Sequence, residues 1–107
     1  MTPDTINRAA TIIAENRLNG TRLDALDPEI RPMDLNDAYA VQERHNEILS
    51  ERGMGRLAGF KIGCTTPGMQ EYMNIHEPSY GEVFEPMVFH NHVELPRAAF
   101  VNPGVEA

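Results

Sequence analysis

The strongest constraint on the fold is a change of hydrophobic period around Gly53 and Gly55. Before these glycines, apolar residues recur every three to four positions, as on one face of a helix. After them, residues 57–64 alternate and carry two glycines, which is typical of a strand that another group approaches closely. The sequence therefore predicts an α+β fold, with a helical region at residues 1–55 and a strand-rich region at residues 56–107.

The helical region carries start and stop signals for two helices. They are the cap Thr2 with Pro3 and the terminator Gly20 for the first helix, and the cap Asp34 for the second. A hydroxyl or carboxylate cap satisfies first-turn amides, proline suits the first helical position, and glycine adopts the left-handed conformation that ends a helix. We therefore expect helices over residues 3–19 and from about 34 to 52, separated by a loop at residues 20–33.

The strand-rich region contains one further helix signal and several short apolar runs. Thr66 and Pro67 can cap a short helix that covers Met69 to Met73. Residues 77–81 contain proline, serine and glycine, which is typical of a turn. We expect short strands at residues 87–89, 93–95 and 97–101. Strands need partners, so this region is expected to pair with further polypeptide.

Composition excludes some classes of protein. Sixteen acidic residues against nine basic ones give a formal charge of -7, and no basic patch of the kind that binds nucleic acid is visible. A single cysteine, Cys64, rules out an intrachain disulfide and fits a reducing compartment. The sequence shows no signal-peptide pattern and no apolar run of membrane-spanning length. We expect a cytoplasmic protein with no membrane partner.

The segment most indicative of chemistry is residues 59–66, which read GFKIGCTT. Lys61 stands between two glycines on an otherwise apolar strand. Glycine lets a ligand come close to the backbone, and an ammonium group can meet a carboxylate or enolate oxygen. The alternative interpretation is a lysine on an edge strand that points to solvent.

Three other features could carry chemistry. Glu106 can bind a hard cation such as magnesium, although a lone glutamate is commonly a surface acid. His90 and His92 share one face of an extended chain, which zinc could use, but no suitably spaced third ligand accompanies them. A turn explains this pair better. Cys64 is a weak candidate nucleophile, because no histidine lies near it in sequence.

Several of these segments together resemble one enzyme family. They are residues 37–42 (DAYAVQ), residues 59–66, Gln70, the Pro78 to Gly81 turn, and residues 103–106 (PGVE). In this order they resemble the 2-keto-4-pentenoate hydratase and 4-oxalocrotonate decarboxylase group of the fumarylacetoacetate hydrolase superfamily. The resemblance covers about residues 5 to 107. Cys64 and Thr66 stand where this group more often has leucine and serine.

The resemblance implies a lyase that adds water to 2-hydroxypenta-2,4-dienoate (2-keto-4-pentenoate) in the catabolism of aromatic compounds. It implies Mg²⁺ or Mn²⁺ as cofactor, since a hard cation stabilises the charge of an enolate. By the match, Lys61 contacts the 2-keto acid substrate and Glu106 is a metal ligand. The residues implied to line the substrate pocket are Gly63, Thr65, Thr66 and Gln70. The helices would precede a mixed, β-rich catalytic fold, and the enzyme is expected to be a homo-oligomer.

The length of the chain limits what it is expected to do alone. The family's second metal glutamate would follow Ala107, so the sequence is interpreted as an N-terminal fragment that is inactive by itself. A 4-oxalocrotonate decarboxylase is the alternative within the family, and association with a decarboxylase or hydratase of the same pathway is compatible with both. A non-catalytic oligomerisation or regulatory module is the alternative from another class.

Overall fold

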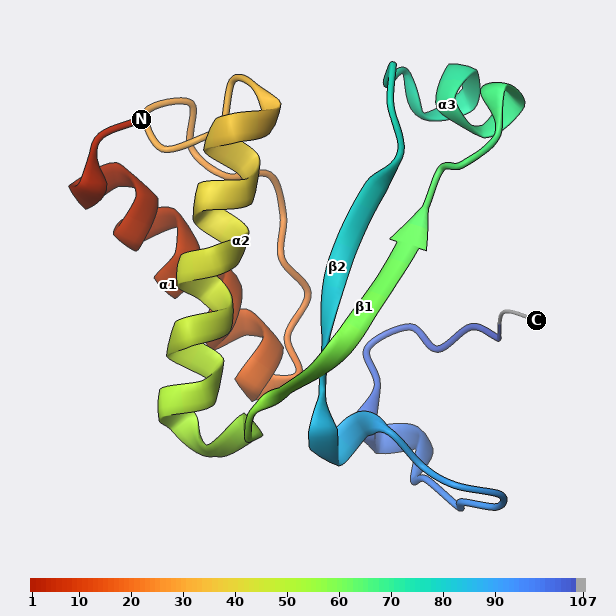
Figure 1. Ribbon diagram of the computed structural model, residues 1–107. Helices are drawn as coiled ribbons and strands as arrows, with labels where there is room; N and C mark the ends of the chain where they lie inside the picture. The colour runs from red at the N-terminus through yellow and green to blue at the C-terminus, as the bar shows by residue number, and fades with distance from the viewer. Residues whose placement is uncertain (106–107) are drawn as a thin grey trace. The chain divides into compact units, whose positions relative to one another are not determined.

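The computed structural model describes residues 1–105, which form two compact units (Figure 1). One unit is built from Met1–Gly53 together with the segment from His90 onward, and the other from Met54–Phe89. Within residues 1–105 there are three α-helices and one two-stranded antiparallel sheet, so the predicted α+β class is confirmed. None of the helices in this part of the chain is both long enough and apolar enough to cross a bilayer.

Helix α1 spans Pro3–Asn19, with the bounds and caps that the sequence predicts. The Thr2 hydroxyl accepts a hydrogen bond from the Thr5 amide at 3.2 Å, and the Thr5 hydroxyl accepts one from the Thr2 amide at 2.9 Å. This reciprocal capping satisfies two amides that have no partner within the helix. Gly20 ends α1 in the left-handed conformation, at a φ of 63°.

Helix α2 spans Leu35–Leu49 and begins at the predicted cap. The Asp34 carboxylate accepts a hydrogen bond from the Asp37 amide at 2.8 Å. The α-helix ends at Leu49 rather than near residue 52, because Ser50–Met54 form a wider, π-helical turn. Gly53 ends this turn at a φ of 94°, a conformation that glycine adopts without a steric penalty.

The core of the first unit lies where α1 packs against α2, and Figure 1 shows the two helices side by side. Its buried apolar residues are Ala9, Ala10 and Ala14 on α1, Ile30 in the following loop, and Val41, Ile48 and Leu49 on α2. The fully buried residues of α1 are thus all alanines, while Ile6 and Ile13 are half-buried. Small side chains let two helix axes come close together.

The second unit is a β-hairpin with a helix in its connection. Strand β1 spans Leu57–Gly63, strand β2 spans Ser79–Phe84, and α3 spans Pro67–Met73 between them. The predicted strand and the predicted short helix are therefore confirmed. The predicted turn at residues 77–81 is only partly right, because β2 already begins at Ser79.

The hairpin contains a one-residue irregularity near the start of β1. Leu57 pairs with Phe84, but Gly59 pairs with Val83, so β1 holds one residue more than β2 over this stretch. Such a β-bulge interrupts the strict alternation of side chains between the two faces. Leu57 therefore lies on the same face as Phe84, while Gly59 lies on the opposite face.

The strands predicted at residues 87–89, 93–95 and 97–101 are wrong. The structure has short 3₁₀ turns at Glu85–Met87 and Arg97–Ala99 and no strand between residue 85 and residue 105. Pro86 starts the first turn and Pro96 caps the second. Proline has no amide hydrogen to donate to a sheet, so these positions favour turns over strand pairing.

Candidate functional site

Lys61 lies in the middle of β1, on a face of the hairpin that it shares with three glycines, Ser79 and Val83. Its partner across the sheet is Gly81, and its neighbours on the same face of β1 are Gly59 and Gly63. A Cβ atom built on Gly59 or Gly81 would meet nothing within 4 Å. The solvent-exposed lysine therefore stands among glycines, where a ligand can lie directly against the backbone.

Ser79 adds a hydroxyl group to the same face. It pairs with Gly63, and its Oγ lies 3.8 Å from the position that a Gly63 Cβ would occupy. With Lys61, these residues line a shallow depression of about 330 Å³, completed by Ile62, Tyr80, Gly81, Glu82 and Val83. An ammonium group and a hydroxyl group beside bare backbone can together bind a small carboxylate. The sequence prediction had not singled out Ser79.

The opposite face of the hairpin is mostly apolar, with Glu82 across from Phe60. Phe60 and Ile62 alternate with Lys61 along β1, and Tyr80 lies across from Ile62. The rings of Phe60 and Tyr80 meet edge to face, with centroids 5.9 Å apart. Such aromatic pairs across two strands stabilise a hairpin and fix its register. The register in turn keeps Lys61 opposite Gly81.

A cluster at the base of the hairpin holds the two strands together. The Arg56 guanidinium donates two hydrogen bonds to Glu85, at 2.7 and 2.9 Å, and the Glu85 amide donates to the Arg56 carbonyl at 2.8 Å. Arg56 holds the pKa of the Glu85 carboxyl below its ordinary value. Gly55, at a φ of 82°, leaves room for Pro86, whose ring atoms would lie only 3.0 Å from an added Cβ.

The turn after β1 contains the other predicted substrate-binding residues. Cys64 adopts a φ of 55°, and its carbonyl oxygen accepts a hydrogen bond from the Gln70 side chain at 2.8 Å. The Thr66 hydroxyl caps α3 by accepting from the Met69 amide at 3.4 Å, and Thr65 is exposed. The depression beside Lys61 includes Gly63 but not Thr65, Thr66 or Gln70.

The described residues do not form a metal site. Within residues 1–105, no three histidine, cysteine, aspartate or glutamate side chains lie close enough together to hold an ion. Glu106, the predicted metal ligand, falls outside the described residues. His92 lies 3.6 Å from the exposed carboxylate of Glu94, as measured from Nε2 to Oε1.

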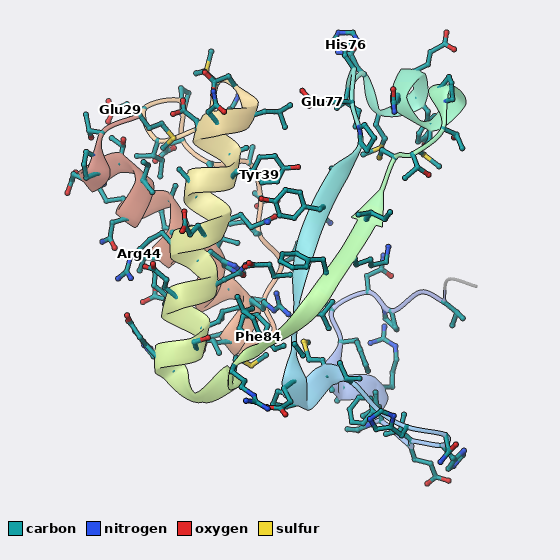
Figure 2. The ribbon with its side chains drawn as sticks, in the orientation of Figure 1. Glu29, Tyr39, Arg44, His76, Glu77 and Phe84 are labelled. Atoms are coloured by element: carbon teal, nitrogen blue, oxygen red, sulfur yellow. The ribbon has the colours of Figure 1, made fainter. Side chains whose placement is uncertain are left out.

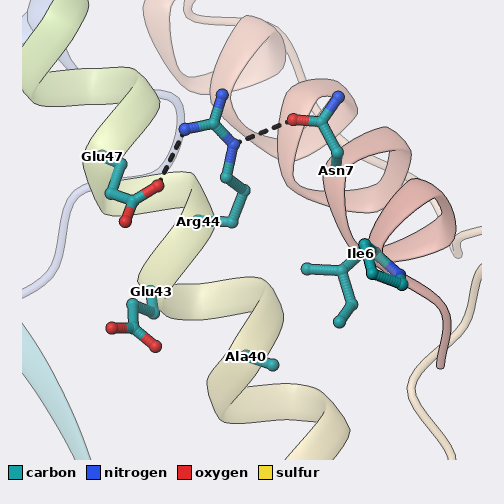
Figure 3. Close-up of a pocket in the computed structure, with 7 residues that line it drawn as sticks. Ile6, Asn7, Ala40, Glu43, Arg44 and Glu47 are labelled. Atoms are coloured by element: carbon teal, nitrogen blue, oxygen red, sulfur yellow. Dashed lines mark hydrogen bonds and ion pairs between the residues drawn. The ribbon is translucent and has the colours of Figure 1, made fainter.

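A second depression, of about 410 Å³, lies in the first unit between α1 and α2 (Figure 3). Arg44 crosses it, with its Nε donating to Asn7 and one terminal nitrogen donating to Glu47, both at 2.8 Å. Figure 2 labels Arg44 on α2. The guanidinium thus links the two helices across this depression.

Comparison with known proteins finds similarity to hydratases, although no family model matches the chain. It is 37% identical over 94 residues to the 2-oxo-hept-4-ene-1,7-dioate hydratase of Escherichia coli, covering 87% of this chain and 34% of that protein. It is 30% identical over all 107 residues to a 2-keto-4-pentenoate hydratase of Paraburkholderia xenovorans, covering 39% of it. A third relative, the 2-keto-4-pentenoate hydratase of Paraburkholderia phymatum, is 37% identical over 70 residues, which are 65% of this chain and 26% of that protein.

The relatives thus define a class, hydratases of small unsaturated keto acids. More particularly, the chain is homologous to the 2-keto-4-pentenoate hydratases and is the counterpart of a part of them. The resemblance seen in the sequence is confirmed. The chain matches between about a quarter and two-fifths of the length of these relatives.

Proposed function

We propose that this chain forms part of a lyase that adds water to 2-hydroxypenta-2,4-dienoate, or 2-keto-4-pentenoate, in the catabolism of aromatic compounds. The observation that carries the proposal is the position of Lys61 on a glycine-lined face of the hairpin, opposite Gly81. The homology to hydratases gives the class of substrate that this face would bind.

Lys61 would bind the oxygens of the 2-keto acid. Hydration of such a substrate passes through an enolate-like species, so negative charge grows on the oxygen at carbon 2. An ammonium group beside that oxygen lowers the energy of the charged species, and the effect increases where water is excluded. Gly63 and Gly81 would let the flat substrate lie against the backbone, and the Ser79 hydroxyl would donate to its carboxylate.

The remaining predicted residues keep their proposed roles. Thr65 and Thr66 belong to the proposed wall of the substrate site, Gln70 is proposed to support that wall rather than to touch the substrate, and Glu106 is proposed as one ligand of Mg²⁺ or Mn²⁺. No three potential metal ligands lie together within residues 1–105. The proposed roles therefore concern how side chains and backbone groups bind the substrate. The division into a helical region, 1–55, and the start of a catalytic domain, 56–107, is part of the same proposal.

Three further features belong to the proposed function. The complete enzyme would be a homo-oligomer, it would act in the cytoplasm, and the 107 residues alone would show negligible turnover. Robust turnover by the isolated chain would contradict the last point. A decarboxylase acting on 4-oxalocrotonate remains the second candidate, because the same stabilisation of an enolate lets carbon dioxide leave.

A chimera tests the proposal. The 94 matched residues of the Escherichia coli hydratase would be replaced by those of this chain, and turnover of 2-oxohept-4-ene-1,7-dioate measured. Replacing Lys61→Met in the chimera should lower kcat by about tenfold or more, the scale of one lost charge contact. Arg56→Met removes a cation of the same hairpin that is bound to Glu85, and should leave kcat within about twofold.

The outcomes separate the candidates. An active chimera whose kcat is unchanged by Lys61→Met would remove Lys61 from the site. Release of carbon dioxide from 4-oxalocrotonate, without hydration of 2-oxohept-4-ene-1,7-dioate, would favour the decarboxylase.

A further inference from the structure

The turn that follows β1 is held by a single side chain of α3. Gln70 Nε2 donates to the carbonyl oxygen of Cys64 at 2.8 Å, and the Gln70 side chain is partly buried. The same residue is fixed through its backbone, since its amide donates to Thr66 at 3.0 Å and its carbonyl accepts from Ile75 at 2.9 Å. The backbone of Gln70 is thus hydrogen-bonded toward both ends of α3, and its side-chain amide donates to the turn.

The residue that Gln70 holds has an unusual backbone conformation. Cys64 has a φ of 55°, in the left-handed region that a residue with a Cβ atom occupies only when its surroundings require it. The carbonyl oxygen of Cys64 is the one fixed by Gln70. Without that bond, the turn would be free to relax toward the extended backbone that cysteine prefers.

We propose that Gln70 is a positioning residue, which fixes the Cys64 turn and through it the end of β1 that carries Lys61 and Gly63. Gln70 does not line the depression beside Lys61, so it would influence a bound ligand only through this turn. The effect on the turn stands on the geometry alone. The effect on a 2-keto acid rests on the proposed function.

The direct readout of the proposal is the backbone conformation of Cys64, measured in the 107-residue chain without ligand. Because the sequence has one cysteine, selective ¹³C labelling gives a single set of Cα and Cβ signals, whose shifts report φ. Gln70→Leu should move these signals toward extended values and speed exchange of the Met69 amide by about three- to tenfold, the scale of one hydrogen bond. Glu71→Gln, a change at the next and exposed position, should alter neither.

A second variant supplies a signature that side-chain volume alone would not produce. In Gln70→Glu, the protonated acid can donate to the Cys64 carbonyl, but the carboxylate cannot. The left-handed signature should therefore be present below the ordinary glutamate pKa of about 4.3 and lost at pH 7. The wild-type chain should keep the left-handed signature at both pH values. In the Gln70→Leu background, Cys64→Gly should restore slow exchange of the Met69 amide, because glycine adopts a φ of 55° readily.

Binding of 2-oxopentanoate, followed by the NMR signals of the one lysine, separates this proposal from the proposed function. If wild type fails to bind, the proposed function is contradicted, while the Cys64 signals still decide the role of Gln70. If Gln70→Leu weakens binding while the Cys64 signals stay left-handed, Gln70 contacts the ligand directly and the proposal is wrong. Unchanged Cys64 signals in both Gln70 variants at pH 7 would also overturn it.

Discussion

Replacing Leu49→Ala should cost the first unit a large share of its stability. Leu49 is completely buried on α2, in the core that α2 forms with α1, whose fully buried residues are three alanines. A packed helix pair collapses only in part around a deleted leucine, so a cavity is left. A fully buried Leu→Ala change costs about 2–5 kcal/mol, and about 3–4 kcal/mol is expected here.

The expected loss in the free energy of unfolding is large relative to the total stability. A domain of this length is stable by roughly 5–15 kcal/mol, so a loss of about 3–4 kcal/mol removes a substantial fraction. With a urea m-value of about 1–3 kcal/mol/M, the unfolding midpoint should fall by about 1–4 M. Urea unfolding followed by circular dichroism at 222 nm measures the shift, because α1 and α2 supply most of the helix.

Leu35→Ala provides the matched control. It removes the same atoms from the same helix, but Leu35 is 41% exposed, so the loss should stay below about 1.5 kcal/mol. Equal midpoints for the two variants would refute the reasoning, since they would mean that the packing of α1 on α2 contributes nothing specific at Leu49.

Two further predictions concern a helix end and pH. Thr2→Ala removes the hydroxyl that caps α1 and should lower the free energy of unfolding by about 1 kcal/mol, whereas Thr2→Ser should retain most of it; thermal unfolding measures both. Burial lowers the pKa of His45, as does the charge of Arg17, while the bond to Asn46 opposes the shift. The unfolded chain therefore binds a proton that the folded chain resists, and stability should fall as pH drops below the unfolded value of about 6.5. His45→Gln, which does not titrate, should lose less stability between pH 7.5 and pH 5 in urea unfolding, and an equal loss in both proteins would contradict this role.

The parts of the fold that follow local rules could be predicted from the sequence. The bounds of α1 are right to the residue because Thr2, Pro3 and Gly20 act on their immediate neighbours. The cap of α3, Thr66, and its end at Met73 are also right, although the helix begins at Pro67 rather than at the predicted Met69. Each of these signals depends on backbone groups within one helical turn, so no knowledge of tertiary structure is needed.

The wrong predictions fall where the structure depends on pairing between segments that lie far apart in the sequence. The runs after Pro86 have strand-like composition, but a strand forms only with a partner, and none is described for them up to residue 105. In the candidate site, glycines on either side made Lys61 visible in the sequence. Ser79 was missed because its place beside Gly63 follows from the register of two strands that lie far apart in the sequence.

Because of the extra residue in β1, the number of residues in this strand decides which side chains share a face with Lys61. The bulge lets Leu57 share a face with Phe60 and Ile62, so that Lys61 keeps the glycine-lined face. If residues 57–61 alternated strictly, without the bulge, Leu57 and the Lys61 ammonium group would lie on one surface. This exposed stretch should therefore accept changes of residue type more readily than an inserted residue, the reverse of what solvent exposure alone would lead one to expect.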